Sequence, residues 1–146
     1  MESGDDEQVV AGADRVGVEL VGETSIEEDH GIPGIFAARV RGIGGDVEAG
    51  LRRWRHLLQR AKEHGHEKLL IVRDLHGPMI SERELSSFMQ HLGVDIRGLR
   101  IALVQPHLDR YRIDELGTLL AMERGADARV FPDEPSALLW LRYGDD

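Results

Sequence analysis

The stretch that decides the fold is LLIVRDLHGPMISERELSSF, residues 69–88. It opens with a continuous apolar run, which is typical of a central strand covered on both faces. A turn at Gly77 and Pro78 follows. Ser81 and Glu84 then have the spacing of a capping box, which predicts the start of a helix. The residues expected to face inward on this helix are Leu85, Phe88, Met89 and Leu92.

A longer amphipathic helix is predicted upstream, in residues 42–66. Its apolar residues recur at alternating steps of four and three, which places them on one face of a helix. They are Val47, Leu51, Trp54, Leu58 and Ala61. Gly65 is well placed to end this helix, because glycine readily adopts the left-handed conformation at a helix terminus.

Downstream, the strand and helix patterns repeat twice. Residues 99–106 have the pattern of a buried strand and residues 107–126 that of a helix. A short strand is predicted in residues 128–131, and Asp133 marks the start of a final helix. Trp140 in that helix is expected in the core, like Trp54. Gly117 inside a helix predicts a close approach to another helix.

The N-terminal part is predicted to contain two strands. Residues 1–14 are acidic and small, which favours a flexible tail. Residues 15–22 and 35–42 alternate in polarity and are predicted to be strands that pair antiparallel. The intervening residues 23–34 are rich in charge, Gly and Pro, and predict a loop. In the first strand, Val16, Val18 and Leu20 are expected to face the core.

These elements predict an α/β fold. Consecutive strands separated by helices imply parallel pairing through right-handed crossovers. We expect a single-layer mixed sheet, mostly parallel, with helices packed against it. The folded domain is expected to span residues 15–146, since 146 residues suit one domain.

Composition excludes several classes of function. The chain has no cysteine, so disulfides, thiolate nucleophiles and cysteine metal sites are excluded. Its formal net charge of −9 makes nucleic acid an unfavourable partner. No apolar run is long enough to span a membrane, and the acidic start does not resemble a secretory signal. We therefore expect a cytoplasmic protein.

Three local motifs carry a family resemblance. A strand ends in Asp74-Leu75-His76 before a short loop and a helix, LRIALVQP follows, and ARVFPDEPSALLWLR lies near the end of the chain. In this order the motifs resemble the SpoIIAA-like branch of the STAS superfamily, the anti-sigma-factor-antagonist fold shared distantly with CRAL-TRIO lipid-binding domains. The resemblance covers about residues 15–143.

The resemblance implies a non-enzymatic regulatory module without a cofactor. STAS domains typically have Asp-Ser-Ser-Gly at the helix start, and with a one-residue deletion in the loop, residues 81–84 fall on that motif. Glu82 then occupies the position of the phosphorylatable serine. Family members present this loop to a protein partner, sometimes under control of phosphorylation and sometimes with a nucleotide or lipid nearby.

The candidate site is the turn after the central strand, because ligands collect beyond the carboxyl ends of parallel strands. The loop after the next strand is expected to line the same edge, where backbone N–H groups of a helix start can bind an anion. The predicted partner-binding or ligand-binding residues are Asp74, His76, Gly77, Ser81, Glu82, Arg83, His107 and Tyr111. The expected ligand is a protein, or a small anionic or lipid molecule, and a homodimer is left open.

Several interpretations of the turn remain open at this point. Ser81 can be only a helix cap, with Glu84 closing the capping box. Ser81 can also be a phosphorylation site, since a phosphate is favoured at a helix N-terminus. A hydrolase would use Ser81 and His76 with Asp74, but no G-x-S-x-G motif is present.

The 42–66 helix has two further features that bear on function. His56, His64 and His66 suggest a metal site, but histidines near a helix end also favour the dipole, so no metal is predicted. The basic residues of this helix predict a solvated face, or alternatively a lipid or membrane surface. They are Arg52, Arg53, Arg55, Arg60 and Lys62.

Overall fold

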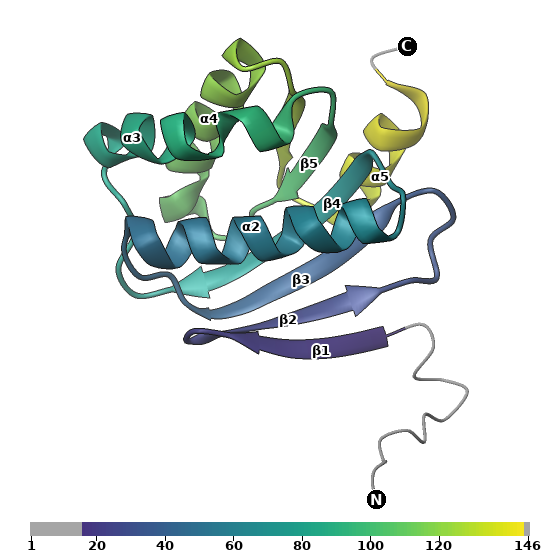
Figure 1. Ribbon diagram of the computed structural model, residues 1–146, viewed down its shortest axis with the longest axis horizontal. Helices are drawn as coiled ribbons and strands as arrows, with labels where there is room; N and C mark the ends of the chain where they lie inside the picture. Colours follow the sequence, from purple (N-terminus) through teal and green to yellow (C-terminus); the bar gives the residue numbers. More distant parts are fainter. Residues whose placement is uncertain (1–15, 145–146) are drawn as a thin grey trace, which may run out of the picture.

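The computed structural model describes residues 16–144 and contains one six-stranded sheet (Figure 1). The strands lie in chain order: β1 Val16–Val21, β2 Thr24–Asp29, β3 Phe36–Ile43, β4 Lys68–His76, β5 Arg100–Val104 and β6 Asp127–Phe131. The pairs β1–β2 and β2–β3 are antiparallel, and the other three pairs are parallel. The predicted mixed, mostly parallel sheet is confirmed. The predicted tail, residues 1–14, lies outside the described residues.

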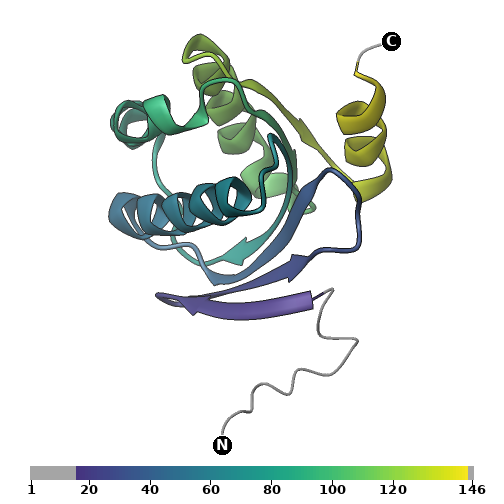
Figure 2. The same ribbon diagram turned by 45° about the vertical axis from the view of Figure 1, so that its right-hand side comes forward.

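Helices cover both faces of the parallel part of the sheet (Figure 2). The helices α2 Val47–Glu63, α3 Glu82–Leu92 and α4 Leu108–Glu123 pack on one face, and α5 Glu134–Tyr143 packs on the other. A short 3-10 helix, η2 Gly93–Ile96, follows α3. None of the helices in the described range is both long and apolar enough to span a bilayer.

The predicted helical stripes form the larger part of the core. The inward-facing residues predicted for α3 are all buried, as are Leu51, Trp54, Leu58 and Ala61 of α2. Trp140 packs with α5 on the opposite face, against β4, β5 and β6. Both tryptophans are therefore in the core, as expected.

The predicted loop in residues 23–34 is wrong, because β2 lies there and pairs with both β1 and β3. The predicted strands at 15–22 and 35–42 are therefore separated by β2 and do not pair with each other. The alternation is carried by Thr24, Ile26 and Glu28, all buried. Because Glu28 occupies an inward position, the sequence lacks the apolar pattern expected of a strand. The buried Glu28 is tolerated because Arg60 and His30 bind its carboxylate.

The apolar side of β1 also differs from the prediction. Val18 and Leu20 are 62% and 81% exposed. Their cross-strand partners are Glu27 and Ser25, which places them on the face that α2 does not cover. α5 contacts β4, β5 and β6 and leaves β1 uncovered on that face. Alternation in β1 therefore predicted a strand correctly but not which face is buried.

Candidate functional site

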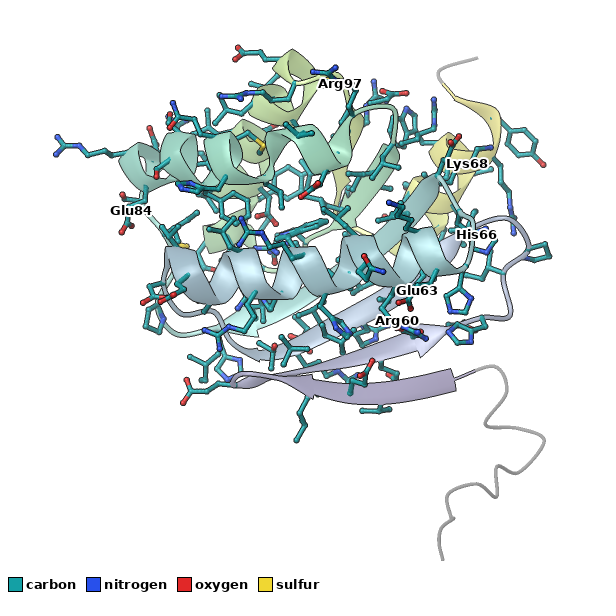
Figure 3. The ribbon with its side chains drawn as sticks, in the orientation of Figure 1. Arg60, Glu63, His66, Lys68, Glu84 and Arg97 are labelled. Carbon is teal, nitrogen blue, oxygen red and sulfur yellow. The ribbon has the colours of Figure 1, made fainter. Side chains whose placement is uncertain are left out.

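The turn between β4 and α3 is shaped by Gly77 and by the cap of α3. Gly77 has a φ of +79°, a conformation that glycine adopts without strain. The Ser81 hydroxyl accepts a bond from the Glu84 N–H at 3.1 Å, and the Ser81 N–H donates to the Glu84 carboxylate at 2.9 Å. The predicted capping box is confirmed, and Figure 3 shows Glu84 at the outer end of α3.

Asp74 lies at the carboxyl end of β4, on the face of the sheet that carries α5, since it follows Leu70 and Val72 at alternate positions. Its carboxylate lies 2.9 Å from the His107 ring nitrogen and 3.7 Å from Arg41. The hydrogen bond from His107 holds the pKa of Asp74 below its usual value, against a smaller opposing effect of burial. Both side chains of the pair are 40% exposed.

The start of α4 is joined to the turn by further contacts. Arg110 donates a hydrogen bond to the Gly77 carbonyl, and Arg112 lies 3.3 Å from the Glu82 carboxylate. Together with the His107–Asp74 pair, these contacts bring the 74–84 turn and the start of α4 to one edge of the sheet, and the predicted 106–111 loop is helical from Leu108 onward. The prediction that both segments line the same edge is confirmed.

Other predicted site residues do not converge. His76 and Ser81 are exposed, and within residues 16–144 no hydrogen bond joins them. The Tyr111 hydroxyl donates to the Val130 carbonyl at 3.1 Å, so it faces β6. Arg83 is exposed on α3. The structure therefore does not assemble the serine, histidine and aspartate that a hydrolase at this turn would need.

A cavity that the sequence analysis missed lies between the sheet and the helices α2, α3 and α4. Its volume is about 110 Å³. Four charged side chains line it: Arg53, Arg73, Arg110 and Asp114. Arg73 is on the inner face of β4, in alternation with Ile71 and Leu75, and lies 2.9 Å from Asp114. Gln105 also donates to Asp114 at 2.9 Å.

Arg53 contradicts the prediction that the basic residues of α2 form a solvated face. It is only 7% exposed, and its guanidinium donates to the Gly44 carbonyl at 2.7 Å. Burial lowers the pKa of Arg53 to about 10, with further contributions from the positive charges of Arg73 and Arg52. Arg52, Arg55 and Lys62 are exposed as expected, which leaves fewer cations for a membrane surface than the sequence indicated.

A second cluster of charge lies where α2 meets β2. Arg60 binds the buried Glu28 carboxylate through two nitrogens, at 2.7 and 2.9 Å, and also Glu63 at 2.9 Å (Figure 3). The rings of His30 and His64 lie beside the Glu28 carboxylate. Glu28, His30 and His64 are residue types that bind metals, and their ligand atoms lie close together. A guanidinium nitrogen of Arg60 lies 3.3 Å from the His64 ring nitrogen, so a metal ion would have to displace Arg60.

Comparison with known proteins gives one structural similarity. No protein-family model and no curated protein matches the sequence. The fold is similar to the crystal structure of an uncharacterised DUF3478-family protein from Shewanella loihica PV-4, described as having a SpoIIAA-like fold. The TM-score is 0.43 and the identity 19%, over 86% of this chain and 91% of that chain. That description concerns the fold of that protein.

Proposed function

We propose that this protein is a non-enzymatic regulatory module of the SpoIIAA/STAS type that binds a protein partner at the carboxyl edge of its sheet. The observation that supports this most is the bonding of α4 to the 74–84 turn. His107, Arg110 and Arg112 each contact that turn, so the turn and the start of α4, which are distant in sequence, form one surface. Preorganised loops lose little entropy on binding.

The same edge exposes apolar side chains. Ile43 ends β3, Met79 lies in the turn and Leu108 begins α4, and these are 36%, 48% and 87% exposed. Apolar side chains surrounded by charged groups are typical of protein interfaces, which have an apolar centre and a polar rim. Asp74, His107, Glu82 and Arg112 would supply that rim. The edge therefore has the composition expected for a partner surface.

Site-specific photo-crosslinking in the protein's own cells tests this proposal. A photo-reactive residue in place of Leu108 should give one crosslinked product of defined mass. The matched control is Val94 in η2, which is 81% exposed and lies outside this edge. The partner, once identified and purified, should bind wild type and lose affinity for Leu108→Asp. Equal crosslinking from Val94 and Leu108, or an unaffected Leu108→Asp, would contradict the proposal.

Phosphorylation of Ser81 is a second regulatory proposal at this edge. Ser81 is exposed at the N-terminus of α3, where the helix dipole favours a phosphate. The Arg112 guanidinium lies beside Glu82 and is 77% exposed, so it can reach a new anion there. Native mass spectrometry of the protein from its own cells should show a phosphate that Ser81→Ala removes. A phosphate that persists in Ser81→Ala, or none under any growth condition, contradicts this role.

A further inference from the structure

The cavity between the sheet and α2, α3 and α4 has a polar end and an apolar end. The polar end lies under the turn, where Arg53 and Arg110 bond to carbonyls of Gly44 and Gly77. Met79 lines the cavity and is half exposed, so the cavity reaches the surface at the turn. The apolar end is lined by buried side chains that include Leu85, Phe88, Leu92 and Leu103.

The positive charges at the polar end lack matching carboxylates. Arg53 and Arg110 are 7% and 8% exposed, and within residues 16–144 neither has an ion-pair partner. Asp114 is the one carboxylate among the described cavity-lining residues, and it is already bound by Arg73 and Gln105. Three guanidinium groups therefore share one carboxylate.

A buried cation without a counter-charge is costly, because it loses hydration without gaining an ionic partner. An anion bound between Arg53 and Arg110 would offset that cost. The planar fork of a guanidinium fits the two oxygens of a carboxylate or phosphate group. The polar end of the cavity is thus complementary to the head group of an anionic ligand.

Gly117 of α4 keeps the apolar end open. Sequence reasoning expected this glycine to permit a close helix approach, but a Cβ there would meet only the Leu85 side chain, at 3.9 Å. That is an ordinary contact distance, so packing does not require glycine at this position. Glycine weakens a helix relative to alanine, and the space it leaves here borders the cavity.

We propose that this cavity is a binding site for a small amphipathic anion, a carboxylate or phosphate monoester on a short hydrocarbon chain. The head group binds Arg53 and Arg110, and the chain lies against Leu85, Phe88 and Leu103. This cavity of about 110 Å³ is smaller than the apolar cavity of about 150 Å³ that can hold benzene, and it opens at the turn, so only a short hydrocarbon chain fits. This site shares Arg110 and Met79 with the proposed partner surface, but its ligand lies inside the cavity. Binding of a small anion and binding of a protein partner are measured separately, so either proposal can fail without the other.

Isothermal titration calorimetry on the full chain tests the head group and the chain separately. The probes are hexanoate, hexyl phosphate, hexanol and inorganic phosphate. Hexanoate or hexyl phosphate should bind saturably with one-to-one stoichiometry, at least about tenfold more tightly than hexanol, because charged hydrogen bonds are the stronger ones. The tighter of the two anions identifies the head group. If hexanol binds as tightly as the two amphipathic anions, the proposed role of the charged head group is wrong. If inorganic phosphate binds as tightly as they do, the proposed role of the hydrocarbon chain is wrong.

Two pairs of variants locate the binding. Arg53→Met should weaken binding by at least about tenfold, whereas Arg55→Met, an exposed change in the same helix, should not. Gly117→Leu should fill the cavity and block the chain, whereas Leu119→Ala, an exposed change in the same helix, should bind like wild type. Circular dichroism checks the fold of each variant, and the two independent pairs keep the test valid if one variant does not fold. Absence of binding by both anions, or unchanged binding in both Arg53→Met and Gly117→Leu, would overturn the proposal.

Discussion

Two clusters of charge lie along α2, and they differ in how their cations are balanced. At the C-terminal end, Arg60 faces the buried Glu28 carboxylate through two nitrogens. Nearer the N-terminal end, Arg53 faces a carbonyl, another guanidinium and a cavity. The first cluster is complete within the chain, and the second has an excess of positive charge.

This difference in charge balance indicates a structural role for the Arg60 cluster and a binding role for the Arg53 cluster. A buried ion pair whose groups satisfy each other fixes the position of a strand, here β2 against α2. Buried cations beside open space instead have free capacity for a ligand anion. Both arginines come from one basic run, RRWRHLLQR, so residue type and local sequence do not distinguish their roles.

The largest expected effect is on the complete cluster. Glu28→Gln removes the charge that Arg60 and His30 bind, and leaves cations without their partner at a side chain that is 5% exposed. We expect the free energy of unfolding to fall by about 2 to 3 kcal/mol at pH 7. Urea denaturation measures it. A loss below about 0.5 kcal/mol would mean that the pair behaves like an exposed one.

A change of opposite sign is expected at the incomplete cluster. Arg53→Met removes a buried cation without a carboxylate partner, so the free energy of unfolding without ligand should stay unchanged or rise by up to about 1 kcal/mol. The same urea titration measures it, with Arg55→Met as the exposed control. A loss of about 2 kcal/mol or more would show that the bond to the Gly44 carbonyl is structural.

The pH dependence of stability should also follow the Glu28 cluster. Burial raises the pKa of Glu28, but hydrogen bonds from Arg60 and His30 outweigh it and lower the pKa below the ordinary value of 4.5. Stability from the ionised Glu28 is therefore fully present above pH 4.5 and is lost as the pH falls through the folded-state pKa. Melting temperatures from pH 7 to pH 3 should fall more steeply for wild type than for Glu28→Gln. If the melting temperatures of wild type and Glu28→Gln fall in parallel with pH, Glu28 is not the origin of this pH dependence.

The smallest effect is expected at the edge pair. Asp74 and His107 are each 40% exposed, and solvent screens such pairs. Asp74→Asn should therefore cost less than about 1 kcal/mol in urea denaturation. Its main consequence should be weaker binding of the protein partner, measured with the crosslinked partner once purified. If Asp74→Asn lowers stability by more than this and leaves partner binding intact, the Asp74–His107 pair has a structural role instead.

The sequence predicted the parallel half of the fold well, because its signals are local. The continuous apolar run of β4, the Ser81–Glu84 capping box and the stripe of α2 each depend on residues close in the chain. β2 was missed because Glu28 is stabilised by Arg60, 32 residues away. Its burial depends on a partner that local polarity does not show.

The candidate site was predicted in part. Asp74 and His107 could be placed together because Asp74 lies near the carboxyl end of β4 and His107 follows β5, the adjacent parallel strand. Arg73 carried a usable signal, since it alternates with Ile71 and Leu75 inside an apolar run. Arg53 carried a weaker signal of burial. It lies about one turn after Gly50, which is also buried, but the neighbouring Arg52 and Arg55 of the same helix are exposed. The cavity itself follows from how α2, α3 and α4 pack on the sheet, which no local pattern reports.

Arginine side-chain NMR tests the contrast between the two clusters in one titration. With Nε–Hε resonances assigned, hexanoate should shift the signals of Arg53 and Arg110 saturably and leave Arg60 unchanged, because only the first two face the cavity without a carboxylate. Linear shifts confined to exposed arginines such as Arg52 and Arg55, or shifts of Arg60 equal to those of Arg53, would contradict the assignment of the cavity as an anion site.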